Sequence, residues 1–384
     1  MEADLLNNTS PGVAVITGAS GQDGYFLTGR LLSEGWSVHA LTRRPEALRF
    51  DDLSAAANSR LHVHQIDLLE RGPVFDLISR TQPDEVYNLA GQSSVSKSFS
   101  DPLYTWQTNA EAVVHLLECI RKSSLHTRFY QASSTDMFGA SSAGVMPYNE
   151  TSALNPQSPY ASAKAAAHLL CHSYREVYGL RIASGILSNH ESHRRPASFL
   201  TRKVVEHVRE LKGSANSEPA MTLPPLAMGN LKVQRDWGFA PDYVEGMCRI
   251  LRQIAVRAVR TGGTPETDAG ASYRDYVLAT GKTHAVWELV DCAHKIAGFD
   301  LQWDLSGNDA ARWNARFQTT GAPAVVVNPA LLRAAEPLVI QLDPGRAQRE
   351  LGWIPKQGLE VFLQDMFSKP AVSTSAPEAV GAGT

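Results

Sequence analysis

The sequence predicts an α/β protein: a doubly wound parallel sheet with a smaller, mainly C-terminal lobe attached to it. Two features of the first half lead to this fold class. Short apolar runs, typical of strands buried on both faces of a sheet, alternate there with amphipathic segments of helical length. The first of these runs passes directly into a glycine-rich turn, which a helical segment follows. The chain has 384 residues, enough for such a domain and an additional lobe.

Composition and charge argue against several classes of partner. Hydrophobic residues make up 43% and charged residues 20% of the sequence, as in ordinary soluble globular proteins. A net charge of -3 and a pI near 6.5 indicate no excess of positive charge that would bind nucleic acid or an anionic membrane. The acidic start lacks the features of a signal peptide, and no apolar run approaches the roughly 20 residues that span a bilayer. The four cysteines stand far apart, so we expect reduced thiols in a cytoplasmic protein and no metal site.

Residues 13–16 form the first apolar run, and Gly18, Gly21 and Gly24 follow it before a helix predicted over residues 25–34. We expect Gly18 to permit the tight turn, Gly21 to let the backbone approach a pyrophosphate, and Gly24 to let the helix pack on the strand. Glycines at this spacing also occur at purely structural junctions. The order of strand, turn and helix nevertheless favours dinucleotide binding.

The second predicted strand, residues 37–42, ends in Arg43 and Arg44. An enzyme that prefers NAD usually carries an acidic residue at this place, which binds the ribose 2'-hydroxyl. Guanidinium groups suit the 2'-phosphate of NADP instead, because they bind phosphate oxygens in bidentate fashion. The pair therefore favours NADP, with two merely solvated arginines as the alternative.

The following elements keep the alternation that a doubly wound sheet requires. The third strand leads to Asp67 and Leu68, a position suited to the adenine edge, and the fourth opens into residues 91–94. Ligands of open α/β sheets bind at such carboxyl ends of strands. The predicted elements are a strand at 61–66, a helix at 74–80, a strand at 85–90, a helix at 109–122 and a strand at 128–132.

A possible reaction centre follows the fifth strand. Tyr160 and Lys164 share one face of a helix if the helix starts near Ser158. An ammonium group beside a phenol lowers the pKa of the phenol, so Tyr160 could exchange a proton with a substrate hydroxyl near neutral pH. Ser134 and Asp136 add a hydroxyl and a carboxylate just upstream. Because Tyr-x-x-x-Lys also arises by chance, this interpretation depends on the nucleotide-binding elements before it.

Further stretches carry a family resemblance. The sequence is similar to the extended short-chain dehydrogenase/reductases and, more narrowly, to the GDP-mannose 4,6-dehydratases. The similarity covers roughly residues 13–366 and departs at the tails, around 261–272 and around 306–322. Besides the motifs above, it rests on the stretches 21–24, 185–195, 199–203, 235–244 and 351–353.

The resemblance implies a Rossmann-type sheet domain that holds NADP tightly, and a lobe that binds a nucleotide sugar. We expect the NADP-binding domain at 11–187 with returning segments at about 232–255 and 276–282, the substrate-binding lobe at 188–231 and 283–368, and flexible tails at 1–10 and 370–384.

Residue by residue, the resemblance places one set of side chains around the cofactor and another around the substrate. The cofactor set is Gly18, Ser20, Gly21, Gln22, Asp23, Arg43, Arg44, Asp67, Leu68, Leu89, Ala90, Gly91, Gln92, Ser93, Tyr104, Lys164, His190 and Arg195. The substrate set is Ser93, Ser134, Asn189, Arg202, Lys203 and Arg235, in which the cations suit a nucleotide diphosphate.

The resemblance also implies the chemistry. Tyr160 would take the proton of the sugar C4 hydroxyl while hydride passes to NADP, and Lys164 would tune Tyr160. Asp136 would remove the C5 proton and assist loss of the C6 hydroxyl as water, before hydride returns to C6. Ser134 stands where the family has threonine and Asp136 where it has glutamate. The shorter acid reaches less far, which leaves open a simpler reaction, since misplacing a catalytic group by about 1 Å can cost on the order of 10²-fold.

Two alternatives to the dehydratase remain at this point: a ketoreductase or epimerase acting on another nucleotide sugar, and a non-catalytic NADP-sensing protein. The family also implies homodimers that pair into homotetramers. We interpret Trp237 and Trp353 as packing residues. His168 and His172 are interpreted as packing and surface residues, because no acidic neighbour at helical spacing would orient an imidazole there.

Overall fold

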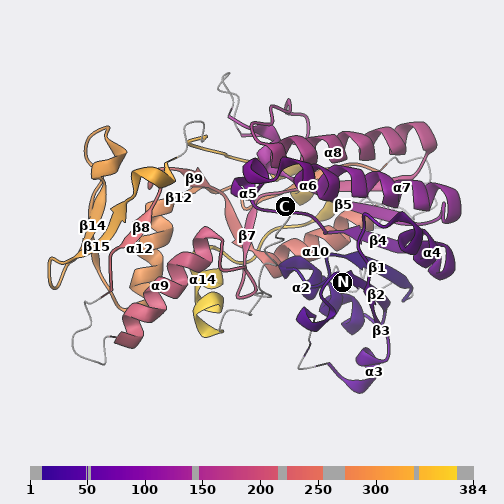
Figure 1. Ribbon diagram of the computed structural model, residues 1–384, viewed down its shortest axis with the longest axis horizontal. Helices are drawn as coiled ribbons and strands as arrows, with labels where there is room; N and C mark the ends of the chain where they lie inside the picture. Colours follow the sequence, from indigo (N-terminus) through magenta and orange to yellow (C-terminus); the bar gives the residue numbers. More distant parts are fainter. Residues whose placement is uncertain are drawn as a thin grey trace, which may run out of the picture. The chain divides into compact units, whose positions relative to one another are not determined.

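The computed structural model describes residues 11–48, 50, 53–140, 147–214, 223–253, 273–332 and 337–369. The chain divides into two compact units, which are described separately (Figure 1). The predicted flexible tails and the irregular segment at 261–272 lie outside the described residues. Within them, no helix combines the length and the apolar character needed to cross a bilayer.

The first unit is built on a seven-stranded sheet with the order β11-β6-β5-β4-β1-β2-β3. Each neighbouring pair is parallel, so all carboxyl ends meet at one edge, as the alternation of strands and helices predicts. The strands are β1 (Val13–Thr17), β2 (Ser37–Thr42), β3 (Leu61–Gln65), β4 (Glu85–Asn88), β5 (Arg128–Ser134), β6 (Arg181–Leu187) and β11 (Tyr276–Leu278).

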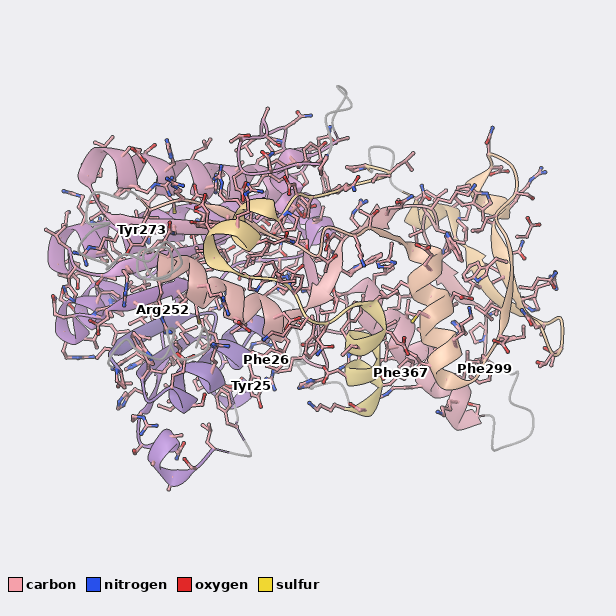
Figure 2. The ribbon with its side chains drawn as sticks, turned by 180° about the vertical axis from the view of Figure 1, so that it is seen from behind. Tyr25, Phe26, Arg252, Tyr273, Phe299 and Phe367 are labelled. Atoms are coloured by element: carbon pink, nitrogen blue, oxygen red, sulfur yellow. The ribbon has the colours of Figure 1, made fainter. Side chains whose placement is uncertain are left out.

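Helices cover both faces of this sheet, which is therefore apolar on each side. One core packs α2 and α10 against residues such as Ile16 and Tyr130, with Phe26 and Tyr273 at its margin (Figure 2). The other packs α4, α7 and α8 against residues such as Val86. The helices are α2 (Gln22–Ser33), α3 (Ala55–Asn58), α4 (Arg71–Thr81), α5 (Val95–Ser100), α6 (Pro102–Trp106), α7 (Ala112–Ser123), α8 (Pro159–Tyr178), α10 (Ala240–Leu251) and α13 (Gly345–Leu351).

The second unit combines a four-stranded sheet, in the order β13-β14-β15-β8, with three helices. In its interior Phe299, labelled in Figure 2, meets Phe317 edge to face at 5.7 Å. Helix α14 packs on α9, and Arg209 Nη2 donates a hydrogen bond to the Phe367 carbonyl at 2.7 Å. The elements are α9 (Leu200–Ser214), β8 (Leu226–Met228), α12 (Val286–Ala297), β13 (Leu301–Asp304), β14 (Asn314–Phe317), β15 (Pro323–Val327) and α14 (Leu359–Ser368).

The domain boundaries differ from the predicted ones in one main respect. We expected residues 283–368 to lie wholly in the lobe, but the described residues 337–358 belong to the first unit. Trp353 explains the difference, because it is buried in the core beside α10 and donates a hydrogen bond to the Asp242 carbonyl at 2.9 Å. Trp237 and Trp353 are both buried, so their interpretation as packing residues is confirmed. Short strands β7 (Asn189–Glu191), β9 (Gln234–Arg235), β10 (Trp237–Phe239) and β12 (His284–Ala285) complete the regular structure.

Candidate active site

A buried polar chain crosses the carboxyl edge of the sheet between β1, β4 and β5. The Thr17 hydroxyl donates a hydrogen bond to Asn88 Oδ1 at 2.7 Å, and Asn88 Nδ2 donates to Gln131 Oε1 at 2.8 Å. Thr17 Oγ1 also accepts hydrogen bonds from the backbone N–H groups of Leu89 and Ala90. The winding of the sheet reverses between β1 and β4, where open α/β sheets bind ligands. The polar chain therefore forms a rigid floor for a ligand site.

The glycine turn lies directly on this floor. Gly18 has a φ of +67°, and a Cβ atom there would lie 2.8 Å from the backbone nitrogen of Ala90. A Cβ atom on Gly24 would lie 2.4 Å from the Gly18 carbonyl oxygen. The steric reasons predicted for these two glycines are thus confirmed. Gly21 is exposed at the start of α2, so its backbone can be approached from outside.

Charged and aromatic groups gather beyond the end of β2. Arg43 Nη1 donates a hydrogen bond to the Tyr104 hydroxyl at 2.6 Å and lies 4.0 Å from the Asp67 carboxylate. Three residues predicted for the cofactor, far apart in sequence, therefore meet here. The backbone N–H of Arg44 donates to the Thr42 hydroxyl at 3.0 Å.

A second long-range contact joins the glycine turn to β7. The Asp23 carboxylate lies 2.9 Å from His190 Nε2, and Gln22 Nε2 donates a hydrogen bond to the His190 carbonyl at 3.0 Å. The His190 ring stacks on Tyr243 with a centroid separation of 4.7 Å. Burial lowers the pKa of Lys164, and the negative charge of Asp23 opposes this shift. Gln22, Asp23 and His190 thus form one cluster.

Ser134 and Asp136 stand at the carboxyl end of β5. Ser134 caps the short 3-10 helix η3 (Thr135–Phe138), because its hydroxyl accepts a hydrogen bond from the Asp136 backbone N–H at 3.2 Å. Gly139 ends this helix with a φ of +61°. Ser134 is buried and Asp136 is partly exposed, so the carboxylate is the more accessible of the two groups.

Helix α8 supplies Tyr160 and Lys164 from its first turns. Ser158 caps the helix by accepting a hydrogen bond from the Ala161 N–H, and Pro159 occupies the first helical position, where it needs no partner for an N–H. Tyr160 and Lys164 are both buried one turn apart, as the spacing predicts.

Lys164 Nζ donates a hydrogen bond to the Ala132 carbonyl of β5 at 3.0 Å. Burial lowers the pKa of Lys164 to about 8, while the charge of Asp23 opposes this effect. The ammonium form therefore still predominates at pH 7. In that form it can stabilise a tyrosinate at Tyr160, which is what proton exchange with an alcohol requires.

Asn109 is a residue that the sequence reasoning missed. It lies in a π-helical turn, η2 (Gln107–Glu111), and its Nδ2 group donates hydrogen bonds to the carbonyls of Gln92 and Thr105. Its Oδ1 atom is buried without a hydrogen-bond partner. A Cβ atom on Gly91 would lie 2.3 Å from this Oδ1 and 3.8 Å from Lys164 Nζ. The acceptor therefore faces the lysine region of the site, and no local sequence signal marks it.

The remaining predicted cofactor residues vary in accessibility. Leu89, Ala90, Gly91 and Ser93 follow β4 and are partly or fully exposed, whereas Gln92 is buried with its amide bonded to Ser94 and Thr105. Gln92 thus stabilises the loop through its side chain. Two more members of the cofactor set are Ser20, whose hydroxyl bonds Thr42 Oγ1 at 2.8 Å, and Leu68, whose carbonyl lies 3.2 Å from His115 Nδ1.

Most of the cations predicted to bind substrate make contacts within their own unit. Arg202 is fully buried in the second unit; it donates to Glu206 at 2.9 Å and to the carbonyls of Met366 and His193. We therefore assign Arg202 a structural role instead of the predicted ligand contact. Lys203 is bonded to the Ala227 carbonyl but exposed.

Three further predicted residues have the following surroundings. Arg195, in the second unit, pairs with Glu191 at 3.0 Å and lies over the Phe199 ring. In the first unit, Asn189 is partly buried and Arg235 donates to the Pro337 carbonyl at 2.9 Å. Within the described residues, no cluster of three or more His, Cys, Asp or Glu side chains could hold a metal ion.

Comparison with known proteins gives a family and a fold. The profile of the family described as GDP-mannose 4,6 dehydratase matches residues 15–366. A GDP-mannose 4,6-dehydratase of Vibrio cholerae is 37% identical over 378 residues, which cover 94% of this chain and 93% of the relative. A GDP-mannose 4,6 dehydratase of Drosophila melanogaster is 33% identical and covers 95% of this chain and 88% of the relative.

Solved structures of lower sequence identity share the fold. RMD from Pseudomonas aeruginosa, complexed with NADPH, has a TM-score of 0.68 at 22% identity, covering 93% of this chain and 98% of its own. A dTDP-glucose 4,6-dehydratase from Streptomyces venezuelae, with NAD bound, has a TM-score of 0.69 at 21% identity, covering 92% and 96%.

Proposed function

Because the chain belongs to the GDP-mannose 4,6-dehydratase family, we propose that it is a hydro-lyase that converts GDP-D-mannose to GDP-4-keto-6-deoxy-D-mannose with loss of one water. One observation carries this proposal beyond the family match. A hydroxyl, a carboxylate, a phenol and an ammonium group come from two adjacent elements at the carboxyl edge of the sheet, beside the glycine turn. These groups are those of Ser134, Asp136, Tyr160 and Lys164.

NADP is the proposed cofactor. The turn at Gly18 and Gly21 fits a pyrophosphate, because a side chain at either position would narrow the approach to the backbone. Arg43 and Tyr104 form a pair that suits a 2'-phosphate through charge and hydrogen bonding. When bound, NADP would supply the nicotinamide ring that takes hydride from C4 of the sugar and gives it back at C6. Arg43→Ala should lower the amount of NADP retained on purification and favour NAD in exchange; unchanged retention would contradict the assignment.

The chain's own groups move the protons. Tyr160, as tyrosinate, takes the proton of the C4 hydroxyl, and the Lys164 ammonium stabilises the phenolate charge before that transfer. Ser134 hydrogen-bonds the sugar O4. Once C4 is a ketone, the C5 hydrogen is acidic; Asp136 removes it and delivers that proton to the departing C6 hydroxyl, which leaves as water. When hydride has returned to C6, the proton that Tyr160 holds goes back to C5, which restores the tyrosinate. For the nucleotide diphosphate we propose contacts from Ser93, Asn189, Lys203 and Arg235.

The test is incubation of the purified protein with GDP-mannose and no added cofactor, followed by mass spectrometry of the product. Loss of one water without consumption of NADPH supports the dehydratase. A ketoreductase would instead consume NADPH stoichiometrically, and an epimerase would leave the mass unchanged. Either outcome would overturn the proposed function.

We also propose that the chain forms homodimers or homotetramers. Helices α5, α6 and α8 pack together and expose large apolar side chains, of which Leu103 is 68% and Leu169 54% exposed. Such a cluster is typical of an interaction surface. Leu103→Glu combined with Leu169→Glu should shift sedimentation to the monomer. Leu125→Glu is the matched control, because Leu125 is similarly exposed (64%) but follows α7.

A cytoplasmic location is proposed from the cysteines. Cys119, Cys171, Cys248 and Cys292 are all unpaired, and the first three are buried. Unpaired thiols persist in reducing compartments.

A further inference from the structure

The reacting side chains come from two elements that the chain does not join directly. Ser134 and Asp136 belong to the end of β5 and to η3, whereas Tyr160 and Lys164 belong to α8. The separation of the two pairs therefore depends on how α8 is held against β5. A displacement of about 1 Å between catalytic groups can cost on the order of 10²-fold in rate.

Consecutive residues of β5 are bonded to consecutive turns of α8. Lys164 Nζ donates to the Ala132 carbonyl at 3.0 Å, and one turn later His168 Nδ1 lies 3.0 Å from the Ser133 hydroxyl oxygen. Ser133 directly precedes Ser134 in the strand. The second bond thus joins the helix to the residue next to the reacting hydroxyl, without using a group that takes part in the chemistry.

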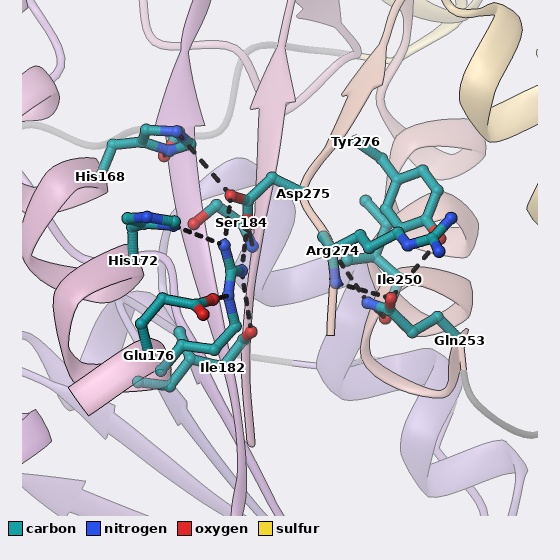
Figure 3. A network of polar contacts seen from close by, with 12 residues as sticks. His168, His172, Glu176, Ile182, Ser184, Ile250, Gln253, Arg274, Asp275 and Tyr276 are labelled. Carbon is teal, nitrogen blue, oxygen red and sulfur yellow. Dashed lines mark hydrogen bonds and ion pairs between the residues drawn. The ribbon is translucent and has the colours of Figure 1, made fainter. Parts of the chain in front are cut away.

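Asp275, just before β11, lies on the other side of the His168 ring (Figure 3). Its carboxylate lies 3.9 Å from His168 Nε2, and it is itself held by Arg175 at 2.9 and 3.1 Å and by the Ser184 N–H at 2.7 Å. At 3.9 Å this carboxylate is beyond hydrogen-bond distance of the ring, so it acts on His168 through its charge. The acid comes from a distant segment, which helical spacing cannot reveal.

The groups around His168 favour one protonation state and one tautomer of its imidazole ring. Burial lowers the pKa of His168; Asp275 opposes the shift, and Arg175 and His172 add to it, so the ring is neutral at pH 7. Burial raises the pKa of Asp275, but the hydrogen bonds and charge of Arg175 outweigh this effect, so the carboxylate is ionised. A carboxylate facing Nε2 favours the proton on that nitrogen, which leaves Nδ1 to accept the Ser133 hydroxyl proton.

We propose that His168 is a positioning residue for the reaction: its hydrogen bond with Ser133, in the tautomer that the negative charge of Asp275 favours, sets the distance between Tyr160 on α8 and Ser134 on β5. This inference rests on the proposed function for its kinetic test. It adds His168 and Ser133 to the residues that the reaction needs, although neither takes part in the chemistry. It also gives the contact between His168 and Asp275 a role.

The order Ser133, His168, Asp275 does not make a nucleophilic triad. Ser133 is only 4% exposed, so a substrate carbonyl cannot reach its hydroxyl. The gap of 3.9 Å between the His168 ring and the Asp275 carboxylate is too long for the hydrogen bond that a triad needs.

The kinetic test compares three variants with the wild type on GDP-mannose. His168→Phe and Ser133→Ala should each lower kcat by about 10- to 100-fold with little change in KM or in bound NADP. The double variant should fall no further than either single one, because both remove the same bond. His168→Asn, whose Oδ1 can replace Nδ1 as acceptor, should recover most of the activity. Val177→Phe is the control: it changes an exposed position (73%) further along α8 and should leave kcat unaltered.

Other outcomes are equally informative. Wild-type kcat in His168→Phe, with only a lower Tm, would overturn the inference and leave a structural histidine. Independent, multiplicative losses in the double variant would also overturn it. If His168→Phe does not fold, Ser133→Ala, which removes one hydroxyl, carries the test.

A readout without turnover separates this inference from the proposed function. In the wild type, ¹⁵N NMR of His168 should report the neutral ring with its proton on Nε2, and Ser133→Ala should change the Nδ1 shift. A failure of GDP-mannose to react would refute the function but not this arrangement. Absence of the Nε2–H form would refute the arrangement even in an active enzyme.

Discussion

The two units use their polar side chains differently. In the first unit, polar groups at the carboxyl edge of the sheet are linked to one another in a buried chain from Thr17 to Gln131. In the second unit, charged groups pair among themselves, as Arg202 does with Glu206 and His193 with Asp365. A cation in a sequence is therefore weak support for ligand binding unless the backbone around it is also arranged for a ligand.

The largest effect is expected in the first unit, from Tyr160→Phe. This change removes the group that we propose takes the C4 proton, so turnover should fall by ~10²–10⁴-fold. Bound NADP, measured after denaturation of the purified protein, should be unchanged. Retained activity would show that a group outside α8 takes the C4 proton.

Asp136→Asn should come next, with a loss of activity on the order of 10²-fold. The amide cannot remove the C5 proton, so exchange of C5 hydrogen with deuterated solvent should also be lost. Asp136→Glu, which restores a longer acid, should retain both activities. Unimpaired exchange in Asp136→Asn would show that another group is the base.

In the second unit, we expect Arg202→Met to lower the stability of the protein and Lys203→Met to raise its KM. Loss of the buried guanidinium bonds should reduce the free energy of unfolding by about 2 kcal/mol with KM unchanged. Lys203 is more exposed, so its removal should raise KM roughly five- to tenfold, about 1–1.4 kcal/mol, without loss of stability. Urea unfolding measures the stability of each variant, and steady-state kinetics measure its KM. A raised KM in Arg202→Met at unchanged stability would restore the predicted ligand contact.

The smallest effect is expected for a histidine cluster on strands β2 and β3 of the first sheet. His39 lies 2.9 Å from His64, and burial, followed by the charges of His62, His64 and Arg80, lowers the pKa of His39 to about 4. An unfolded histidine takes up its proton near pH 6.5, whereas folded His39 does not until about pH 4. Stability should therefore fall as the pH drops from about 6.5 to 4.

His39→Gln should reduce that fall in urea denaturation curves recorded across the same pH range. An equally steep fall in the variant would assign it to other groups.

Local patterns predicted the first unit well. The first strand, its glycine turn and the start of α8 at Ser158 follow from neighbouring residues, because turn sterics and helix capping act over a few positions. The family resemblance placed Arg43, Tyr104, Asp23 and His190 around one cofactor. It did not predict the contacts of Arg43 with Tyr104 and of Asp23 with His190, which come from the structure.

What the sequence did not reveal depends on packing between distant segments. Asn109 faces Lys164 only because its helix widens into a π turn, and Asp275 reaches His168 only when β11 joins the sheet beside β6. The return of residues 337–358 to the first unit depends likewise on Trp353 finding the core beside α10. Arg202 was misjudged because its charge is visible in the sequence and its burial is not.

The passage of the chain between units has a consequence for synthesis and folding. The boundaries after residues 190, 231, 286, 332 and 358 divide each unit into separate stretches. Neither unit is complete until nearly the whole polypeptide has left the ribosome, because α13 and α14 come last. Many native contacts then span long loops, which slows folding and prolongs exposure of apolar surface. A deletion that ends the protein after residue 358 should strip α14 from α9 and yield aggregates instead of an isolated catalytic unit.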